Sequence, residues 1–591
     1  MRNEYPRPEL VRNNFKSLCG LWDFEFDFGN TLHTGFPRFC MTRIQWIFGH
    51  LCDRFTHQIN VPFSPESKLS GIEYKDFINA CWYRRKIDLS DRGNQRVLLH
   101  FEAVFHTSHI FINGKYVGNH FGGYTPFSFD ITDYLTEGET EILLHCKGDP
   151  RNPKQPSGKQ SSDYEPNGCY YDRNSGIWAP VWIEYVPKTY IKDIRYSCDI
   201  VNRRVIATVE IEGSDSGQLT VDTSFAGKDT GSVTLSFDSG GKMICPISLS
   251  ELHLWEVGKG GLYDVSVRIR TRNGEDMVSS YFGMREIAWD NRGVKINGKR
   301  IFQRLVLDQG YYPDGLYTAP EEADFQKDIE MSMRLGFNGA RLHQKVFDRR
   351  FLYEADKAGY ICWEEYPCWG FDTSMDDALS WFLPEWMEAM ERDCNHPCIV
   401  CWCPMNENND FYGRHQNDIF VKQVYEATKK FDPTRPVIDA SWNFHVKTDI
   451  YDVHDYSQGE EFVKRFAHTE DGQIFDSMRY QAQYQGQPYM ISEFGGLKWP
   501  DEGTGWGYNE GNRIVSEEDF LSRLKLFCDT LYGNPRICGS CYTQLYDVQH
   551  EQHGIYYYDR SLKFSEPTLR KIAKIVSSPA EYEKLEDIQE D

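Results

Sequence analysis

From Ile301 to its C-terminus, the chain repeats a short apolar run followed by a segment with helical spacing. The helical segments include residues 321–335, where Phe325, Ile329 and Met333 recur at every fourth position. Eight apolar runs within about 290 residues predict a (β/α)8 barrel. The eight runs are IFQRLVL, FNGARLH, ICWEEYP, CIVCWCPMNE, PVIDASW, YDVHDY, PYMISEF and ICGSCYTQL.

The chain before the barrel has the pattern of antiparallel β-structure in two portions. In residues 1–187, Asn113 and Gly114 stand between two apolar runs, which predicts a tight hairpin. Residues 188–284 contain strands such as VIATVEI and YDVSVRIRT, separated by Gly, Ser and Asp. We therefore expect a multidomain β plus α/β protein: a jelly roll over 1–187, an immunoglobulin-like β-sandwich over 188–284 and the barrel over 285–591.

The composition excludes several classes of partner. The 591 residues include 65 Lys and Arg against 88 Asp and Glu, a formal net charge of −23. That charge argues against nucleic acid or an anionic membrane as the main partner, because both need a basic surface. The N-terminus lacks the apolar core of a signal peptide, and no run is long enough to span a membrane. We therefore expect a cytoplasmic protein whose 17 cysteines are free thiols.

Polar residues end most of the predicted barrel strands. In this fold the active site lies at the carboxyl ends of the strands, so these residues should share one face. The fourth strand runs into Asn406 and Glu407, and the seventh contains Glu493. The other candidates on this face are Arg341, His343, Glu364, Glu365, His454, Asp455, Tyr456, Gln544 and Asp547.

Segments throughout the chain resemble glycoside hydrolase family 2, the family of β-galactosidases and β-glucuronidases. RDCNHPCIVCWCPMNEN resembles the family's Arg-Asp-x-Asn-His-Pro motif, apolar strand and Asn-Glu pair. MISEFGG resembles the family's nucleophile strand. The family's second and third barrel strands are resembled by GFNGARLHQKVFDRRFLYEADKAGYICWEE. LCGLWDFEFD, CWYRRKIDL, FINGKYVG and SGIWAPVWIEYVP resemble its sugar-binding jelly roll. The resemblance follows the family's domain order over nearly the whole chain.

The resemblance implies retaining hydrolysis of terminal β-linked sugars by two glutamates. One carboxyl protonates the leaving oxygen, the other attacks the anomeric carbon, and the two should lie about 5–5.5 Å apart. By the match, Glu407 is the acid/base and Glu493 the nucleophile. We expect Glu407 to be protonated near neutral pH, because it ends an apolar strand near a second carboxylate. The expected substrate is a small carbohydrate or glycoconjugate, no cofactor is implied, and homo-oligomers are common in the family.

The resemblance also assigns residues around the two glutamates. Asn406 is expected to bond the sugar 2-hydroxyl, and Arg341 to lie below Glu493 and keep it ionised. Tyr456 resembles a family tyrosine that contacts the nucleophile, although an aromatic wall residue would fit the same position. His454 is expected to contact sugar hydroxyls, with a structural histidine as the alternative.

Other candidates lie where the sequence departs from the family. His343 stands in Arg-Leu-His-Gln-Lys, where β-galactosidases have Arg-x-Ser-His-Tyr-Pro, so we expect it in an altered sugar pocket. The last barrel strand lacks the family tryptophan, so stacking on the sugar is expected from Trp369, Trp499 or Trp506. Asp172 precedes SGIWAPVW and is a candidate to reach the barrel mouth from the jelly roll, as a loop there does in relatives, although a plain turn aspartate fits it better.

The sequence favours no metal. The magnesium motif of the family's galactosidases pairs a glutamate with a histidine after the third strand, and CWEEYPCWGFD has no histidine. The spacings of Cys394 with Cys398 and of Cys401 with Cys403 differ from the Cys-x2-Cys of zinc sites. In a strand, Cys401 and Cys403 share one face and are expected to pack as small hydrophobes.

The identity of the sugar depends on the last loop. Family β-glucuronidases carry Asn-x-Lys before Gly-Ile-Phe to bind the carboxylate, whereas this chain has Glu551, Gln552 and His553. Because a glutamate there would repel a uronate, β-galactosidase is the first expectation and β-glucuronidase, or another exo-β-uronidase, the alternative. Lys345 and Lys498 follow strands on the active face and stay open as carboxylate ligands. A non-catalytic carbohydrate-binding protein is a third class, against which the two glutamates argue.

Overall fold

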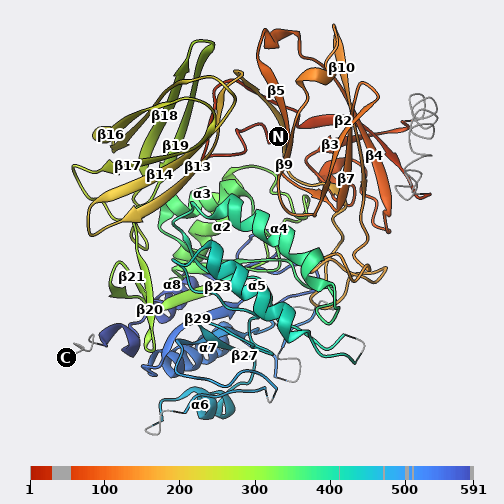
Figure 1. The fold of residues 1–591 in the computed structure, drawn as a ribbon. Helices are drawn as coiled ribbons and strands as arrows, with labels where there is room; N and C mark the ends of the chain where they lie inside the picture. The colour runs from red at the N-terminus through yellow and green to blue at the C-terminus, as the bar shows by residue number, and fades with distance from the viewer. Residues whose placement is uncertain are drawn as a thin grey trace.

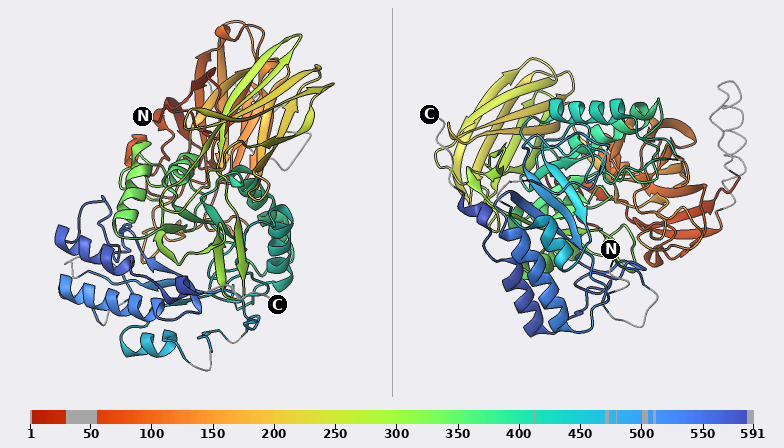
Figure 2. Two further views of the ribbon diagram at one scale, coloured as in Figure 1. Left: turned by 90° about the vertical axis from the view of Figure 1, so that its left-hand side faces the viewer. Right: turned by 90° about the horizontal axis from the view of Figure 1, so that it is seen from below.

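The structure is a computed structural model that describes residues 2–29, 55–411, 413–469, 473–478, 480–499, 505–508 and 512–585. Two antiparallel β-domains lie on the same side of a barrel of parallel strands and helices (Figure 1). Seen from below, the two β-domains lie over different edges of the barrel (Figure 2, right). The predicted fold class is therefore confirmed.

The barrel is a parallel sheet in the order β26-β25-β24-β23-β29-β28-β27. Every residue of these strands is buried, because the helices cover one face and the barrel interior the other. This explains why the strands appear in the sequence as continuous apolar runs. The strands are β23 (Gln303–Asp308), β24 (Gly339–Leu342), β25 (Ile361–Glu365), β26 (Ile399–Cys403), β27 (Tyr451–Asp455), β28 (Tyr489–Gly495) and β29 (Ile537–Thr543).

The fifth predicted strand, PVIDASW, is not a regular strand. Its residues lie beside β26: Val437 forms an isolated bridge with Trp402 of that strand, and Ser441 forms one with Asn406, which follows it. Ser441 also accepts a hydrogen bond from the backbone N–H of Glu407 at 3.0 Å. The segment therefore occupies the fifth position of the barrel, and its irregular backbone supports the turn that carries Glu407.

Helices alternate with the barrel strands, and their ends are set by capping residues. Asp348 accepts a hydrogen bond from the N–H of Arg350 to begin α3, and Asn417 and Ser516 cap α5 and α7 in the same way. The helices are α2 (Ala323–Arg334), α3 (Arg349–Ala358), α4 (Ala378–Asp393), α5 (Asp418–Phe431), α6 (Glu460–Phe466), α7 (Glu517–Tyr532) and α8 (Glu566–Val576). In the described part of the chain, none of the helices combines the length and apolar character that crossing a membrane requires.

The N-terminal domain packs two sheets, in the orders β1-β12-β5-β9 and β3-β2-β4-β10-β7-β8, around one apolar core. The predicted hairpin joins β7 to β8: Asn113 and Gly114 have φ of 50° and 74°, the left-handed values that a two-residue turn needs. The strands are β1 (Phe15–Ser17), β2 (Gly20–Phe26), β3 (His57–Val61), β4 (Ala80–Asp88), β5 (Arg96–Phe101), β7 (Thr107–Ile112), β8 (Lys115–Phe121), β9 (Phe127–Asp130), β10 (Glu139–Lys147) and β12 (Val181–Val186). A separate short ribbon pairs β6 (Val104–Phe105) with β11 (Gly176–Ile177).

The second domain is a sandwich of sheets β13-β14-β17 and β16-β15-β18-β19. A three-stranded ribbon, β20 (Ile287–Asp290), β21 (Gly293–Ile296) and β22 (Lys299–Arg300), leads from it into the barrel. β12 ends at Val186 before β13 begins at Tyr190, and β19 ends at Phe282 before β20 begins at Ile287, so the boundaries that we propose after residues 187 and 284 fall between elements. The sandwich strands are β13 (Tyr190–Asp199), β14 (Arg204–Glu212), β15 (Gly217–Phe225), β16 (Lys228–Phe237), β17 (Gly241–Ser248), β18 (Tyr263–Thr271) and β19 (Gly274–Phe282).

The segment 148–175, which we call the jelly-roll loop, descends from the N-terminal domain to the barrel (Figure 1). The backbone N–H of Ser157 donates to the carbonyl of Trp369 at 2.8 Å, and that of Gly158 donates to the carbonyl of Pro367 at 3.1 Å. Lys154 Nζ lies 2.7 Å from Asp377 Oδ2. The loop is thereby fixed on the segment that follows β25, at the active face of the barrel.

Candidate active site

Two carboxylates meet at the carboxyl end of the barrel. Glu407 follows β26, and Glu493 lies within β28. One oxygen of each and Nδ1 of His454 all lie within 4.8 Å of one another. His454 Nδ1 is 2.6 Å from Glu407 Oε1 and 3.4 Å from Glu493 Oε2. The two carboxyl groups are therefore close enough for the spacing of about 5–5.5 Å that retaining glycosidases use, which is shorter than the roughly 6.5–9.5 Å of inverting enzymes.

The backbone at Glu407 has an unusual conformation. Its φ of 47° lies in the left-handed region, which is uncommon for a residue with a side chain. The bond from its N–H to the carbonyl of Ser441 holds this conformation. Strain of this kind persists where surrounding structure fixes it, often at functional sites.

Arg341, on β24, is fully buried beneath Glu493. Its Nη1 donates to Glu493 Oε1 at 3.0 Å and to the carbonyl of Ser492 at 2.7 Å. Burial raises the pKa of Glu493, but the positive charges of His454, Arg341 and His343 outweigh it and lower that pKa to about 2. Glu493 is therefore an anion across the physiological pH range.

Arg341 also orients the amide of Asn406. Its Nη2 donates to Asn406 Oδ1 at 2.9 Å and lies 2.5 Å from Glu365 Oε1. The Asn406 Nδ2 group is buried and has no acceptor among the described residues. An N–H donor held in this way beside the carboxylates is suited to a sugar hydroxyl.

Aromatic side chains line the same mouth. The Tyr456 hydroxyl donates to Glu493 Oε2, and its ring stacks on Tyr508 with centroids 3.4 Å apart. The Trp369 indole N–H donates to the carbonyl of Asn406 at 3.1 Å. These contacts place the rings of Tyr456, Tyr508 and Trp369 beside the two glutamates and Asn406.

Three sequence models of one protein family match successive segments of the chain. They are the sugar binding domain of glycosyl hydrolases family 2 over residues 66–147, a second family-2 domain over 189–285 and the family-2 TIM barrel domain over 321–522. The chain belongs to glycoside hydrolase family 2.

The curated relatives of this family-2 chain include both β-galactosidases and β-glucuronidases. The chain is 26% identical over 484 residues to a β-galactosidase of Thermoanaerobacter pseudethanolicus, and the match covers 79% of this chain and 60% of that relative. It spans 58% of the β-galactosidase of Thermoanaerobacterium thermosulfurigenes, at 26% identity. It is 24% identical over 568 residues to the β-glucuronidase of Sus scrofa, covering 88% of this chain and 82% of the relative.

Solved structures show the same fold. The β-D-glucuronidase of Dictyoglomus thermophilum superposes with a TM-score of 0.75 at 18% identity, covering 98% of this chain and 99% of that one. A β-glucuronidase of an uncultured Clostridium sp. gives a TM-score of 0.75 at 21% identity, with coverage of 97% and 100%. At these identities the likeness establishes the architecture of the family-2 chain and leaves its substrate open.

The structure brings most of the predicted site residues of this family-2 chain together and places two elsewhere. His343 joins the group through its Nδ1, which lies 2.8 Å from Glu365 Oε2. Trp499 instead packs its ring against Phe564, with centroids 4.9 Å apart. Asp172 pairs with Lys75 at 2.7 Å and accepts a bond from Gln549, so it ties the jelly-roll loop to its neighbours. The residues that gather at the mouth are Arg341, His343, Asn406, Glu407, His454, Tyr456 and Glu493.

Several residues at the mouth were missed by the sequence analysis. Trp442 stacks on His454, with centroids 5.5 Å apart and planes at 10°. Lys159 and Tyr170 arrive on the jelly-roll loop and approach Trp369. These residues stand in loops without periodicity or motif, so no local signal could have identified them.

The two lysines that the sequence left open as carboxylate ligands are bonded to backbone carbonyls. Lys345 Nζ donates to the carbonyl of Gly310 and, at 2.7 Å, to that of Tyr317. Lys498 Nζ donates to the carbonyl of Gly505. Both ammonium groups therefore support the loops around the barrel mouth.

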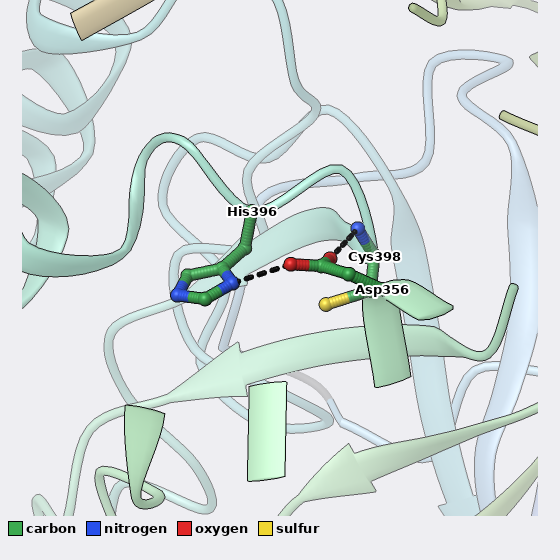
Figure 3. Close-up of side chains that lie close together, drawn as sticks. All are labelled: Asp356, His396 and Cys398. Atoms are coloured by element: carbon green, nitrogen blue, oxygen red, sulfur yellow. Dashed lines mark hydrogen bonds and ion pairs between the residues drawn. The ribbon is translucent and has the colours of Figure 1, made fainter. Parts of the chain in front are cut away.

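Two clusters of the described residues have donor atoms close enough for a cation. One is the group of Glu407, His454 and Glu493, and the other is Asp356, His396 and Cys398. In the second cluster, Asp356 accepts from His396 Nδ1 at 2.6 Å and from the Cys398 N–H at 2.8 Å (Figure 3). Burial opposes a charge on His396, but Asp356 raises its pKa, so Nδ1 keeps its proton and is unsuited to a metal.

Cys401 and Cys403 lie in the buried strand β26. Burial raises the pKa of both thiols well above the ordinary value, so both stay protonated. Their position supports the prediction that they pack as small hydrophobic side chains.

Proposed function

We propose that this chain is a retaining exo-β-glycosidase. The observation that carries the proposal is the pair of Glu407 and Glu493, whose oxygens lie within 4.8 Å at the mouth of a family-2 barrel. In the proposed reaction, ionised Glu493 attacks the anomeric carbon while Glu407 gives its proton to the leaving oxygen. Water then enters, Glu407 takes a proton from it, and the bond from Glu493 to the sugar breaks with release of the β-anomer.

The surrounding residues explain why both steps are favoured. Arg341 keeps Glu493 ionised before attack, and Asn406 offers an N–H to the sugar 2-hydroxyl, a bond that strengthens in the transition state. Tyr456 donates to the Glu493 oxygen that Arg341 Nη1 does not contact. His454, between the two glutamates, fixes the position of Glu407 and offsets the negative charge that Glu407 acquires on giving up its proton.

We propose a terminal β-galactoside as the first substrate. The two β-galactosidase relatives and the carboxylate of Glu551 near the mouth support a neutral sugar. β-Glucuronidase is the second candidate, because the relatives of that name align over more of their own length, 82% for the pig enzyme.

A substrate panel tests this function directly. The purified chain is expected to release nitrophenol from 4-nitrophenyl β-galactoside, with the β-anomer as the first sugar product by proton NMR. The α-anomers of the same glycosides are the control and should not be cleaved. An α-anomer as first product, or no turnover on any β-glycoside, would contradict the proposal, and release from uronides alone would make β-glucuronidase the function.

Removal of Arg341 should change the pH dependence of the reaction. Arg341 is one of the charges that hold the pKa of Glu493 at about 2, so Arg341→Met raises that pKa. The acid limb of kcat/KM should then move to higher pH, because Glu493 must be ionised to attack. We expect kcat/KM to fall on the order of 10²–10³-fold, as for loss of a preorganised charge. Arg341→Lys keeps the positive charge and should leave the acid limb closer to that of the unmodified chain; an unmoved limb in Arg341→Met would contradict this role.

A further inference from the structure

The jelly-roll loop and the last barrel loop meet in a buried ion pair. Lys159 Nζ lies 3.3 Å from Glu551 Oε2, and the two residues are 3% and 1% exposed. Glu551 Oε2 also accepts from the Tyr171 hydroxyl, and its Oε1 lies 3.1 Å from His553 Nε2. Both oxygens of Glu551 are therefore occupied within the chain. The Lys159 ammonium has three N–H donors, and Glu551 is the acceptor that the structure gives it among the described residues.

Trp369 connects this pair to the Glu407 side of the mouth. Lys159 Nζ lies 5.4 Å from the centroid of the Trp369 ring. The indole N–H of Trp369 bonds to the carbonyl of Asn406, the residue before Glu407. Lys159 therefore lies across one tryptophan from the catalytic turn.

Tyr508 connects the same pair to the Glu493 side. Tyr508 stacks on Tyr456, whose hydroxyl donates to Glu493. The Tyr508 ring also makes an edge contact with the ring of His553, at 5.6 Å between centroids, and His553 contacts Glu551. The ion pair is thus joined to the Glu407 side through one ring, Trp369, and to Glu493 through the rings of His553, Tyr508 and Tyr456.

The charges around the mouth disfavour a negative ligand. Among the described residues, the buried carboxylates of Glu365, Glu493 and Glu551 contact two cations, Arg341 and Lys159, and three histidines, His343, His454 and His553, so each of these cations already has a carboxylate partner. Burial opposes the charge on Lys159, but Glu551, and with smaller effects Glu493 and Glu407, raise its pKa, so it stays protonated. A sugar carboxylate would add a further anion, whereas a sugar hydroxyl would accept from Lys159 at no charge cost.

We propose that the Lys159–Glu551 ion pair determines the sugar specificity of this site: Glu551 occupies the ammonium that a sugar carboxylate would need, and the pair selects neutral sugars over uronides. This inference rests on the proposed glycosidase function. The two residues that recognise the sugar then come from different domains. Glu551, on the last barrel loop, affects the sugar by holding Lys159, which belongs to the jelly-roll loop.

The test compares kcat/KM of the full chain on 4-nitrophenyl β-galactoside and β-glucuronide. Glu551→Gln should raise the glucuronide-to-galactoside ratio by about tenfold or more, because Lys159 then lacks its internal counterion. In the double variant Lys159→Met/Glu551→Gln, the glucuronide-to-galactoside ratio should return to that of the unmodified chain, because the ammonium group is gone. The double variant should also fold, because it buries no unpaired charge. The control is Asp377→Asn, which removes another ion pair between the jelly-roll loop and the barrel and should leave the ratio unchanged.

An unchanged ratio in Glu551→Gln, or a gain that persists in the double variant, would overturn the inference. Calorimetric titration of the unmodified chain with galactose and with glucuronate provides a readout that needs neither turnover nor a folded variant. Galactose should bind at least about tenfold more tightly, and equal or tighter binding of glucuronate would overturn the proposed selectivity. A chain that binds galactose selectively but cleaves no β-glycoside would refute the glycosidase function and leave this selectivity standing.

Discussion

Glu493→Ala should lower kcat on a β-galactoside on the order of 10⁴-fold or more. The buried Glu493 is held ionised by Arg341, and the variant loses the carboxylate that is proposed to attack the anomeric carbon. The measurement is steady-state release of nitrophenol, with folding checked by circular dichroism. The matched control is Glu518→Gln, an exposed carboxylate on α7, which should keep full activity.

Azide distinguishes the nucleophile from a merely structural residue. With Glu493→Ala, azide can enter the space left by the carboxylate and attack the anomeric carbon directly, displacing an activated dinitrophenolate. The product should be the α-glycosyl azide, because one inversion occurs in place of two. A β-glycosyl azide, or full turnover by Glu493→Ala without azide, would exclude Glu493 as the nucleophile.

Glu407→Ala should show a different dependence on the leaving group. Glu407 is proposed to protonate the departing oxygen, so substrates with poor leaving groups should lose about 10²–10⁴-fold in kcat/KM. Dinitrophenyl glycosides need no protonation and should react with Glu493 almost as fast as in the unmodified chain. The glycosyl-enzyme should then accumulate, visible as a burst, because no base activates water.

The rescue product again tests the assignment. Azide should attack the accumulated glycosyl-enzyme of Glu407→Ala and give the β-glycosyl azide, the opposite anomer to that from Glu493→Ala. Asp410→Asn is the matched control, since Asp410 follows Glu407 by three residues, is exposed and pairs with His415. Equal losses on good and poor leaving groups in Glu407→Ala would contradict its role as the acid.

Sequence patterns predicted the elements that depend on local chemistry. Seven of the eight apolar runs are regular strands in the described residues, because a barrel strand buried on both faces must be apolar along its length. The exception, 436–442, contains Asp439 and Ser441 and bonds to β26 through irregular bridges. The family resemblance added that Glu407 and Glu493 are partners, which no local pattern connects.

The partners of loop side chains could not be predicted in the same way. Three tryptophans were equal candidates for the sugar wall, and the structure places Trp369 at Asn406 and Trp499 against Phe564. His454 was expected to meet sugar hydroxyls, and the structure places its Nδ1 between the two carboxylates. Such positions depend on how loops from distant strands pack, because a loop has no periodicity that orients its side chains.

Glu551 shows most clearly which properties the sequence predicts and which depend on tertiary packing. From the sequence alone it is an unpaired negative charge where family β-glucuronidases have a lysine. The tertiary structure pairs it with Lys159, 392 positions earlier in the chain, in a different domain. The sequence by itself determined the three-domain plan, the barrel and the two glutamates, since these depend on strand patterning and motif. Only the tertiary structure decided the charge around the proposed sugar site, because that charge is a sum over residues that folding alone brings together.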